Sequence, residues 1–430
     1  MNRRRFLRFA GLASGALAWG SLAGCLGDGR LDAPGMIDRP DLSEGPAWPT
    51  FGSDAANTGH DPDASGPTDD ASIVWEFDAG SPTANTPPVV VGDAVYTGSS
   101  GTGGNLWALD AESGDRYWEF ETDGWVNHAP AVADGTVFVG TDGQTVHAVD
   151  ARSGDERWSV DLGRDLHDSS PTVVDGTVFV GTAGDSPATV SGDEDEDEVN
   201  RAGMVVALDA DTGGTRWSFE VSDWISTTPA VAEGRVYFGD ATGRVRALDA
   251  STGEEVWSFD VGSKVLSSPA LTDGTLYFGA NGRLYALDAR TGDPHWTFDL
   301  RWPTVKSSPA VAGGTVFVGC HGGGGCRLVP DDETCDAPDE TGSLHAVDAD
   351  LGAEEWRYDV ERDVRSSPAV ADGIVYLGCA GGASAVRAAD GREAWRVEFG
   401  SYVDSSPAVA DGRVFVNCSD GKVYALGDSQ

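Results

Sequence analysis

The sequence predicts an all-β fold, namely an eight-bladed β-propeller of four-stranded antiparallel blades, closed by an N-terminal strand that completes the last blade. The first observation behind this prediction is a tryptophan that recurs at Trp75, Trp118, Trp158, Trp217, Trp257, Trp296, Trp356 and Trp395. Most of the intervals are 39–43 residues long, and two are 59 and 60. A period near 40 residues is typical of a repeat architecture in which each unit is one supersecondary structure.

The second observation is that the units share four short runs rich in Val, Phe, Tyr and Thr, as at 307–311, 315–319, 344–348 and 355–358. Alternation and β-branching predict a strand for each run. Asp-Gly pairs such as Asp134-Gly135 join the first run to the second, and Ser-Gly or Thr-Gly pairs join the third to the fourth. These pairs supply the positive φ angles of tight hairpins. Each unit is therefore a four-stranded meander, and its Trp fills the space between neighbouring blades.

The third observation concerns the two ends of the repeat. Eight first strands are marked by Pro88, Pro130, Pro171, Pro229, Pro269, Pro309, Pro368 and Pro407, but the last unit stops at Leu426 without a Trp-bearing strand. Conversely, the run 73–77 around Trp75 has no unit before it. The two halves complete one blade. A ring closed in this way has no exposed sheet edge at the seam.

The repeat resembles that of a known family. The run Ala-Leu-Asp-Ala-Ser-Thr-Gly-Glu-Glu-Val-Trp at 247–257, and the lead-in Trp-Pro-Thr-Phe-Gly at 48–52 with Asn-Thr-Gly at 57–59, are similar to the pyrroloquinoline-quinone (PQQ) repeat propellers. The resemblance covers about residues 48–427, and the chain is similar to outer-membrane-assembly, BamB-like lipoprotein propellers, here of a haloarchaeal type. It implies the fold. It does not choose a function, because the family includes quinone-dependent dehydrogenases as well as non-catalytic binding proteins.

The N-terminus is predicted to be an export signal rather than part of the ring. Residues 1–25 combine Arg3-Arg4-Arg5, a short apolar stretch and Leu-Ala-Gly-Cys at 22–25, an order that resembles a twin-arginine signal with a lipobox. We expect Cys25 to carry a lipid, and the protein to be exported and anchored to the outer side of the cell membrane. Residues 26–70 are expected to form a flexible acidic tether and residues 71–428 the propeller.

The charge of the chain indicates its environment. The chain has 29 basic and 70 acidic residues, a formal net charge of −41, and Lys264, Lys306 and Lys422 are its only lysines. Molar salt screens such self-repulsion, because the Debye length falls to about 3 Å. We therefore expect a halophilic source. Nucleic-acid binding is disfavoured because the sequence has no basic patch.

The units differ at one face of the ring. Loops between second and third strands and connections from one unit to the next share a face, and the insertions 183–202 and 321–342 lie there. We call this the insertion-bearing face. The position just before each inner strand varies, as Asn85, Asn127, Asp168, Ser226, Leu266, Lys306, Arg365 and Asp404, while aromatics precede it at Trp125, Trp224, Trp302 and Tyr402. These residues are the candidate site for a ligand or partner; the alternative is that they are solvent-facing loop ends.

Five cysteines remain besides Cys25. Cys326 and Cys335 lie in the second insertion and are the preferred disulfide pair, with Cys320 joined to either of them as the alternative. A zinc site at these residues has the right ligand types without tight spacing, so we expect no metal. The acidic run 193–198 lacks the Gly and Glu of a calcium-binding EF-hand loop.

Two functions remain open. The first is a non-catalytic propeller, a monomer on the cell surface that binds a protein or a glycan at the insertion-bearing face without a cofactor. The second is a PQQ-dependent dehydrogenase with calcium, or another oxidoreductase. The sequence has neither the adjacent Cys-Cys pair found in many such dehydrogenases nor a recognisable catalytic motif, so we name no catalytic residue.

Overall fold

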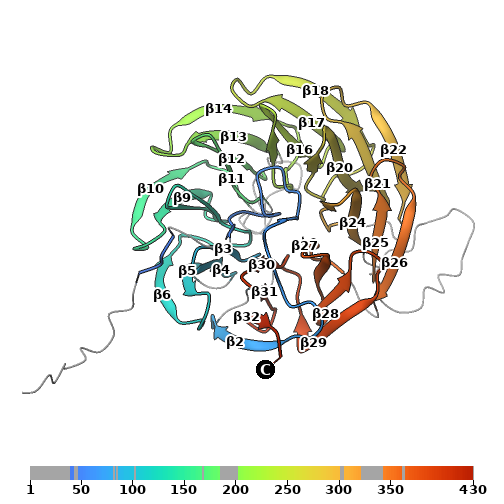
Figure 1. The fold of residues 1–430 in the computed structure, drawn as a ribbon. Coiled ribbons are helices and arrows are strands. Elements are labelled where there is room, and N and C mark those ends of the chain that lie inside the picture. Colours follow the sequence, from blue (N-terminus) through green and yellow to red (C-terminus); the bar gives the residue numbers. More distant parts are fainter. Residues whose placement is uncertain are drawn as a thin grey trace, which may run out of the picture. The chain divides into compact units, whose positions relative to one another are not determined.

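The computed structural model describes residues 39–42, 47–80, 83, 86–100, 103–166, 169–184, 202–300, 305–320, 342–360 and 364–429. Their regular elements are all β-strands, and they form eight sheets arranged as blades around a ring (Figure 1). This confirms the predicted eight-bladed propeller. Within these residues no helix is long and apolar enough to cross a membrane. The predicted signal 1–25, Cys25 and the tether up to residue 38 lie outside the described residues.

Seven blades follow the chain in order from inner to outer strand. The first four are β3 (Val89–Val91), β4 (Ala94–Gly98), β5 (Asn105–Asp110) and β6 (Arg116–Glu121); β7 (Ala131–Ala133), β8 (Thr136–Gly140), β9 (Thr145–Asp150) and β10 (Glu156–Asp161); β11 (Thr172–Val174), β12 (Thr177–Gly181), β13 (Met204–Asp209) and β14 (Thr215–Glu220); and β15 (Ala230–Ala232), β16 (Arg235–Gly239), β17 (Arg244–Asp249) and β18 (Glu255–Asp260). The next three are β19 (Ala270–Thr272), β20 (Thr275–Ala280), β21 (Arg283–Asp288) and β22 (Pro294–Asp299); β23 (Ala310–Ala312), β24 (Thr315–Cys320), β25 (Gly342–Asp348) and β26 (Glu354–Val360); and β27 (Ala369–Ala371), β28 (Ile374–Arg387) and β29 (Glu393–Tyr402).

The seventh blade departs from the four-strand pattern in one respect. The single strand β28 takes the place of a second and a third strand, since its first residues pair with β27 and its last ones with β29.

The ring is closed as predicted. The eighth blade consists of β30 (Ala408–Ala410), β31 (Arg413–Asn417), β32 (Lys422–Gly427) and, as its outer strand, β2 (Ser72–Asp78) from the other end of the chain. β2 pairs antiparallel with β32 from Ser72 opposite Gly427 to Asp78 opposite Lys422. The seam is therefore a regular strand pair, and the Lys422 ammonium also lies 2.8 Å from the Glu76 carboxylate across it.

The hairpins form where Asp-Gly predicted them. In the turn between β7 and β8, Asp134 has a φ of 47° and Gly135 a φ of 69°. Asp175, Asp273, Asp372 and Asp411 adopt the same left-handed conformation. Two successive positive φ angles match the twist of the flanking strands, which is why this dipeptide ends the short inner strand so regularly.

The recurring tryptophans tie each blade to the next. The indole Nε1 of Trp118 in β6 donates to the carbonyl of Ala151 in the next blade at 3.0 Å, and Trp158, Trp217, Trp257, Trp296 and Trp356 repeat this bond one blade further on. The indole ring also packs on the glycine of the neighbouring hairpin, because a Cβ at Gly154 would lie only 2.9 Å from Trp118. Each of these tryptophans therefore supplies a hydrogen bond and buried area at one blade interface.

The seventh blade shows how the N-terminal residues take part. Trp395 donates at 2.7 Å to the carbonyl of Pro67, which stands where the other blades offer the third-to-fourth hairpin. We call residues 47–68 the crossing segment, since they run across the middle of the ring (Figure 1). The backbone of this segment accepts hydrogen bonds from Val132, Val231, Leu271, Val311, Val370 and Gly412 of six blades.

The expected tether is therefore too long. Residues 47–68 belong to the propeller, and the short strand β1 (Ala47–Trp48) even pairs with β3. The prediction is wrong here because a segment rich in Gly, Pro, Asp and Ser can be ordered when its backbone bonds to the blades, as residues 47–68 do. In the structure these residues meet the ring through their backbone and through buried turns such as Asn57, so their composition says little about their order.

Two sets of backbone hydrogen bonds define the two faces. On one face, third-to-fourth hairpins bond to first-to-second turns, as Ala111 N does to Asp93 O at 2.8 Å. On the other face, second-to-third loops bond to the blade-to-blade connections, as Asp142 N does to Trp125 O at 3.1 Å. The second face is the insertion-bearing face, although residues 185–201 and 321–341 of its insertions are outside the described residues.

Candidate functional site

A cavity of about 580 Å³ lies where the blade-to-blade connections meet the inner strands. We call it the central cavity. Its lining comprises Phe51, Pro87, Asn127, His128, Ser170, Trp224, Ser226, Thr228, Leu266, Ser268, Lys306, Ser308, Arg365, Ser367, Asp404 and Ser406. All eight blades are represented by residues just before an inner strand, because every connection enters its blade from the same side of the ring.

The variable position of the repeat lines this cavity. The structure brings together Asn127, Ser226, Leu266, Lys306, Arg365 and Asp404, each from a different blade. Asn85 and Asp168 belong to the same column of the sequence but lie outside the described residues. The six residues of this column that the structure describes therefore face one common space.

The cavity brings basic groups together in a strongly acidic chain. Lys306 and Arg365 stand on neighbouring blades and both are exposed to the cavity. Arg365 Nη1 lies 3.9 Å from Asp404 Oδ2 of the next blade. Lys264 lies outside the lining, but its ammonium is 4.5 Å from the centre of the Trp224 ring, which does line the cavity. Two of the three lysines of the chain are thus at this mouth.

Asn127 is buried at the cavity wall and hydrogen-bonded there. It is 6% exposed, and its amide nitrogen donates to Asp142 at 3.3 Å and 3.2 Å, to one carboxylate oxygen each. Asp142 lies on the loop between β8 and β9 of the same blade. The pair fixes the amide plane of Asn127 at the cavity wall, so a ligand there meets a polar group that is already oriented.

Sequence reasoning missed a ring of hydroxyl groups deeper in the cavity. The backbone N–H of Ser170 donates to the hydroxyl of Thr228, and the same bond continues from blade to blade through Ser268, Ser308, Ser367 and Ser406 at 2.9–3.2 Å. The signal was present as Ser-Ser-Pro or Thr-Thr-Pro at the start of six inner strands; Thr86-Pro87 and His128-Ala129 interrupt it. Because each hydroxyl oxygen accepts a backbone hydrogen bond, its own hydrogen can be donated into the cavity.

The crossing segment provides the floor, which the sequence did not reveal either. Phe51 lines the cavity, while its neighbour Thr50 donates to the carbonyl of Pro171 at 3.4 Å. Asn57, which is 1% exposed, donates at 3.2 Å and 3.1 Å to the carbonyls of Thr228 and Pro269 in two adjacent blades. The inner strands are thus bridged on the side away from the insertion-bearing face.

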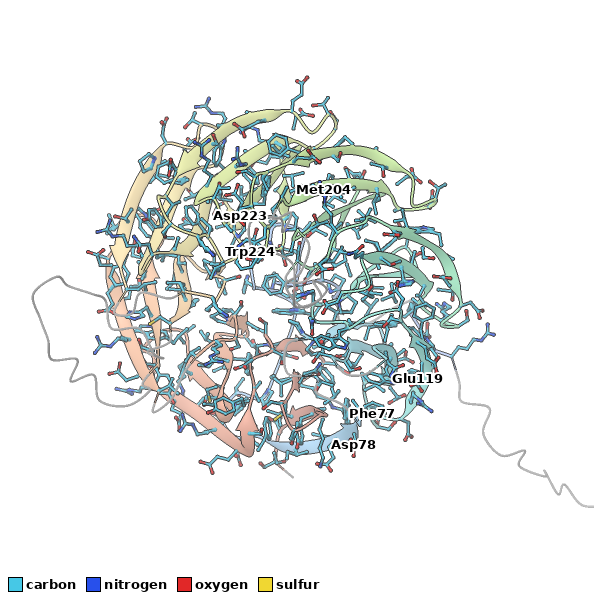
Figure 2. All side chains as sticks on the ribbon, turned by 180° about the vertical axis from the view of Figure 1, so that it is seen from behind. Phe77, Asp78, Glu119, Met204, Asp223 and Trp224 are labelled. Carbon is cyan, nitrogen blue, oxygen red and sulfur yellow. The ribbon has the colours of Figure 1, made fainter. Side chains whose placement is uncertain are left out.

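The predicted aromatic residues divide into two groups. Trp224 is 39% exposed and lines the cavity. It lies toward the middle of the ring, unlike Glu119 of β6, which lies near the outer edge (Figure 2). Trp125, on the connection into the second blade, and Tyr402, the last residue of β29, are 46% and 42% exposed but are not part of the lining. Their carbonyls accept hydrogen bonds from Asp142 and Ser419, so the connections that carry them are held in place. Trp302 is outside the described residues.

The buried histidines belong to the blade interiors. His345 bridges Glu354 at 2.8 Å and Ser343 at 3.0 Å, and Cys320 lies 3.1 Å from that serine. His147 similarly bridges Glu156 and Asp123 at 2.9 Å and 3.1 Å. Both rings pack edge-on against a phenylalanine of the preceding blade, and neither lines the central cavity.

The remaining cysteine predictions are only partly covered by the structure. Cys320, Cys379 and Cys418 are buried at equivalent positions of the repeat in three successive blades. Burial raises the pKa of the Cys418 thiol to about 11, which makes it a poor nucleophile near neutral pH. The predicted disulfide partners Cys326 and Cys335 lie outside the described residues, as does the acidic run 193–198.

The described lining does not fit a calcium-bound quinone. Calcium takes six to eight oxygen ligands, among which carboxylates dominate, whereas the described lining offers one carboxylate, Asp404, which faces Arg365. Among the described residues, no three His, Cys, Asp or Glu side chains are grouped so as to hold a metal ion. What this lining can do is donate hydrogen bonds to a ligand and balance a negative charge.

Fold and cavity together define an eight-bladed propeller with a polar pocket on its axis, and comparisons with known proteins agree with this class. The family model described as outer membrane protein assembly factor BamB, a PQQ-like repeat model, matches residues 65–194, 201–332 and 340–429. The chain belongs to this family, as the resemblance of its repeats predicted.

The curated relatives that the chain matches include two alcohol dehydrogenases and a serine/threonine-protein kinase. The chain is 29% identical over 174 residues to quinohemoprotein alcohol dehydrogenase ADH-IIG of Pseudomonas putida, a match that covers 36% of this chain and 22% of that protein. The chain thus spans about a fifth of the length of the curated relatives it matches.

Solved structures share the fold at low identity. A europium-containing methanol dehydrogenase has a TM-score of 0.72 at 16% identity, covering 90% of this chain and 99% of that one. BamB from Moraxella catarrhalis has a TM-score of 0.62 at 20% identity, covering 84% and 98%. Likeness at this level of identity extends to the fold alone.

Proposed function

We propose that this propeller is a non-catalytic binding or scaffold protein whose partner, a protein or a glycan, engages the central cavity and its rim on the insertion-bearing face. One observation carries the proposal. The residues in which the blades differ most, among them Asn127, Lys306, Arg365 and Asp404, converge on one cavity, while the rest of the repeat stays nearly constant. Variation confined to a shared pocket is typical of a binding site built on a fixed scaffold.

The location that we propose follows from the N-terminal motifs. The twin arginines at 3–5, the apolar stretch and Cys25 favour export and a lipid anchor, with the propeller outside the cell membrane. The family description as an outer membrane protein assembly factor agrees with a protein that meets its partner at a membrane surface. Mass spectrometry of the membrane-bound form tests the anchor, since the proposal requires a lipid on an N-terminal Cys25.

The quinone-dependent dehydrogenase is the second candidate, and the similarity to ADH-IIG over 36% of the chain favours it. It is the weaker candidate because the described cavity lining holds one carboxylate beside two basic groups. Thermal unfolding in high salt with and without added PQQ and calcium separates the two. Stabilisation together with quinone-dependent dye reduction would favour the enzyme; neither effect is expected here.

Charge reversal tests the proposed binding site. We expect Lys306→Glu combined with Arg365→Glu to abolish capture of the partner from membrane extracts, because both groups line the cavity. Arg290→Glu is the matched control, since Arg290 is exposed on the hairpin between β21 and β22 of the opposite face. The variants should melt at the same temperature as the native protein. If capture by the double variant were unchanged, the choice of face would be wrong.

A further inference from the structure

We propose that the ligand of the central cavity is an acidic sugar, a uronic acid residue of a glycan. This inference rests on the proposed function and specifies the ligand of the same site. It follows from three kinds of group that the structure brings together: basic side chains, a ring of hydroxyl donors and one exposed indole face.

The basic side chains point to a negative charge on the ligand. Lysine is rare in this chain, with three residues among 430, yet Lys306 lines the cavity and Lys264 contacts Trp224 at its edge. Arg365 adds a guanidinium that is 43% exposed and can bind a carboxylate with two hydrogen bonds. Asp404 offsets one of these charges and, 3.9 Å from Arg365, helps to orient it. The described lining therefore carries a net positive charge in a protein of net charge −41.

The hydroxyl ring points to a ligand with many oxygens. Thr228, Ser268 and Ser308 are 3%, 6% and 4% exposed and line the cavity. Each of these oxygens accepts a backbone N–H from the neighbouring blade, which leaves its hydrogen to be donated to an acceptor. Asn127 adds a fixed amide at the wall. A carboxylate alone would use the basic groups, whereas a sugar also presents ring and hydroxyl oxygens to such a set of donors.

The indole points to a ring-shaped ligand. Trp224 is 39% exposed at the cavity, and the ammonium of Lys264 is 4.5 Å from its ring centre. This contact holds the side chain in place and leaves part of the indole to the cavity, where an apolar sugar face can pack on it. The volume of about 580 Å³ lies within the roughly 300–1,000 Å³ of small-ligand sites.

Titration with short oligosaccharides tests the inference. We expect trigalacturonic acid to bind the full chain in 2 M KCl (about the ionic strength such an acidic protein needs), measured by calorimetry or by quenching of tryptophan fluorescence. The neutral maltotriose should bind at least about tenfold more weakly, a difference of about 1.4 kcal/mol. Lys306→Met and Arg365→Met should each weaken trigalacturonic acid at least fivefold, and Trp224→Ala should weaken both sugars. Arg290→Met is the matched control and should change nothing.

Three results would overturn the inference: no binding of trigalacturonic acid, equal binding of the neutral sugar, or equal or tighter binding of hexaglutamate or PQQ. The melting temperature of each variant shows that it is folded. If the partner captured in the charge-reversal experiment depends on Lys306 and Arg365 but trigalacturonic acid does not bind, the proposed function stands and only the sugar is wrong. If neither binds, both are wrong.

Discussion

At the scale of single residues, glycine is required where the indole of one blade meets the hairpin of the next. Gly292 has a φ of 78°, and a Cβ there would lie 2.7 Å from the Trp257 ring. Gly274 has a similar φ of 75° but open space around it. We expect Gly274→Ala to cost about 1–2 kcal/mol for its backbone strain and Gly292→Ala to cost a further 1–3 kcal/mol or so for overpacking. Denaturant unfolding at fixed salt measures both, and equal losses would contradict the assigned role of the Trp–Gly contact.

His345 gives a prediction of pH dependence. Burial lowers the pKa of His345 from its usual 6.5, although Glu354 opposes this effect. As pH falls below 6.5, the unfolded chain takes up a proton here before the folded one does, so folded stability is lost. The contribution of this residue is at most about 1.4 kcal/mol per pH unit. We expect His345→Gln to flatten the fall in unfolding free energy between pH 6.5 and 5. If the unfolding free energies of the native protein and of His345→Gln fell with the same slope between pH 6.5 and 5, this prediction would be refuted.

At the scale of elements, the crossing segment is the main addition to what the sequence predicted. Asn57 has a φ of 56° and bonds to Thr228 and Pro269 of two blades. We expect Asn57→Gly to cost about 1–3 kcal/mol through the lost hydrogen bonds, and Asn57→Ala to cost about 1 kcal/mol more through backbone strain. Thermal or denaturant unfolding measures which of the two variants is less stable. Native stability in Asn57→Ala would mean that the segment does not brace the ring.

The strands themselves were predictable for local reasons. Asp-Gly turns, β-branched runs and a Trp at fixed spacing each fix one part of a blade, so even the closing strand β2 followed from Trp75 having no unit before it. The crossing segment could not be predicted in this way, because its hydrogen bonds join residues more than 100 positions apart, such as Asn57 and Thr228. Nothing in the local composition of residues 47–68 distinguishes a buried turn from a mobile linker.

The sequence predicted one part of the candidate site, the variable column, and missed another, the hydroxyl ring. Lys306, Arg365 and Asp404 stood out because they differ from the other members of a regular column. The hydroxyl ring was missed because it lies in another column, two positions further along, in which Ser268, Ser308 and most other members carry a hydroxyl. A nearly uniform column is interpreted as part of the scaffold. The hydroxyl ring forms only in the folded propeller, where the backbone N–H of one blade donates to the hydroxyl of the next, as Ser268 does to Ser308.

At the scale of the whole molecule, the net charge predicts a stability that depends on salt. A net charge of −41 is spread over the chain, and repulsion between surface carboxylates opposes the compact state. We expect the melting temperature to rise with KCl, and most of the rise to occur below about 1 M, where the Debye length shrinks from about 10 Å at 0.1 M to about 3 Å. A linear rise up to 3 M would instead indicate general exclusion of salt from the surface. A melting temperature independent of KCl would contradict the prediction.

The central claim is that binding occurs at the cavity on the insertion-bearing face. Hydrogen–deuterium exchange of the protein, alone and with its captured partner, tests this most directly because it covers both faces in one measurement. We expect slower exchange in residues 224–228, 264–268, 305–308 and 364–367, and unchanged exchange in the hairpins around Gly253, Gly292 and Gly352 of the opposite face. Protection confined to those hairpins, or to the outer strands, would contradict the claim.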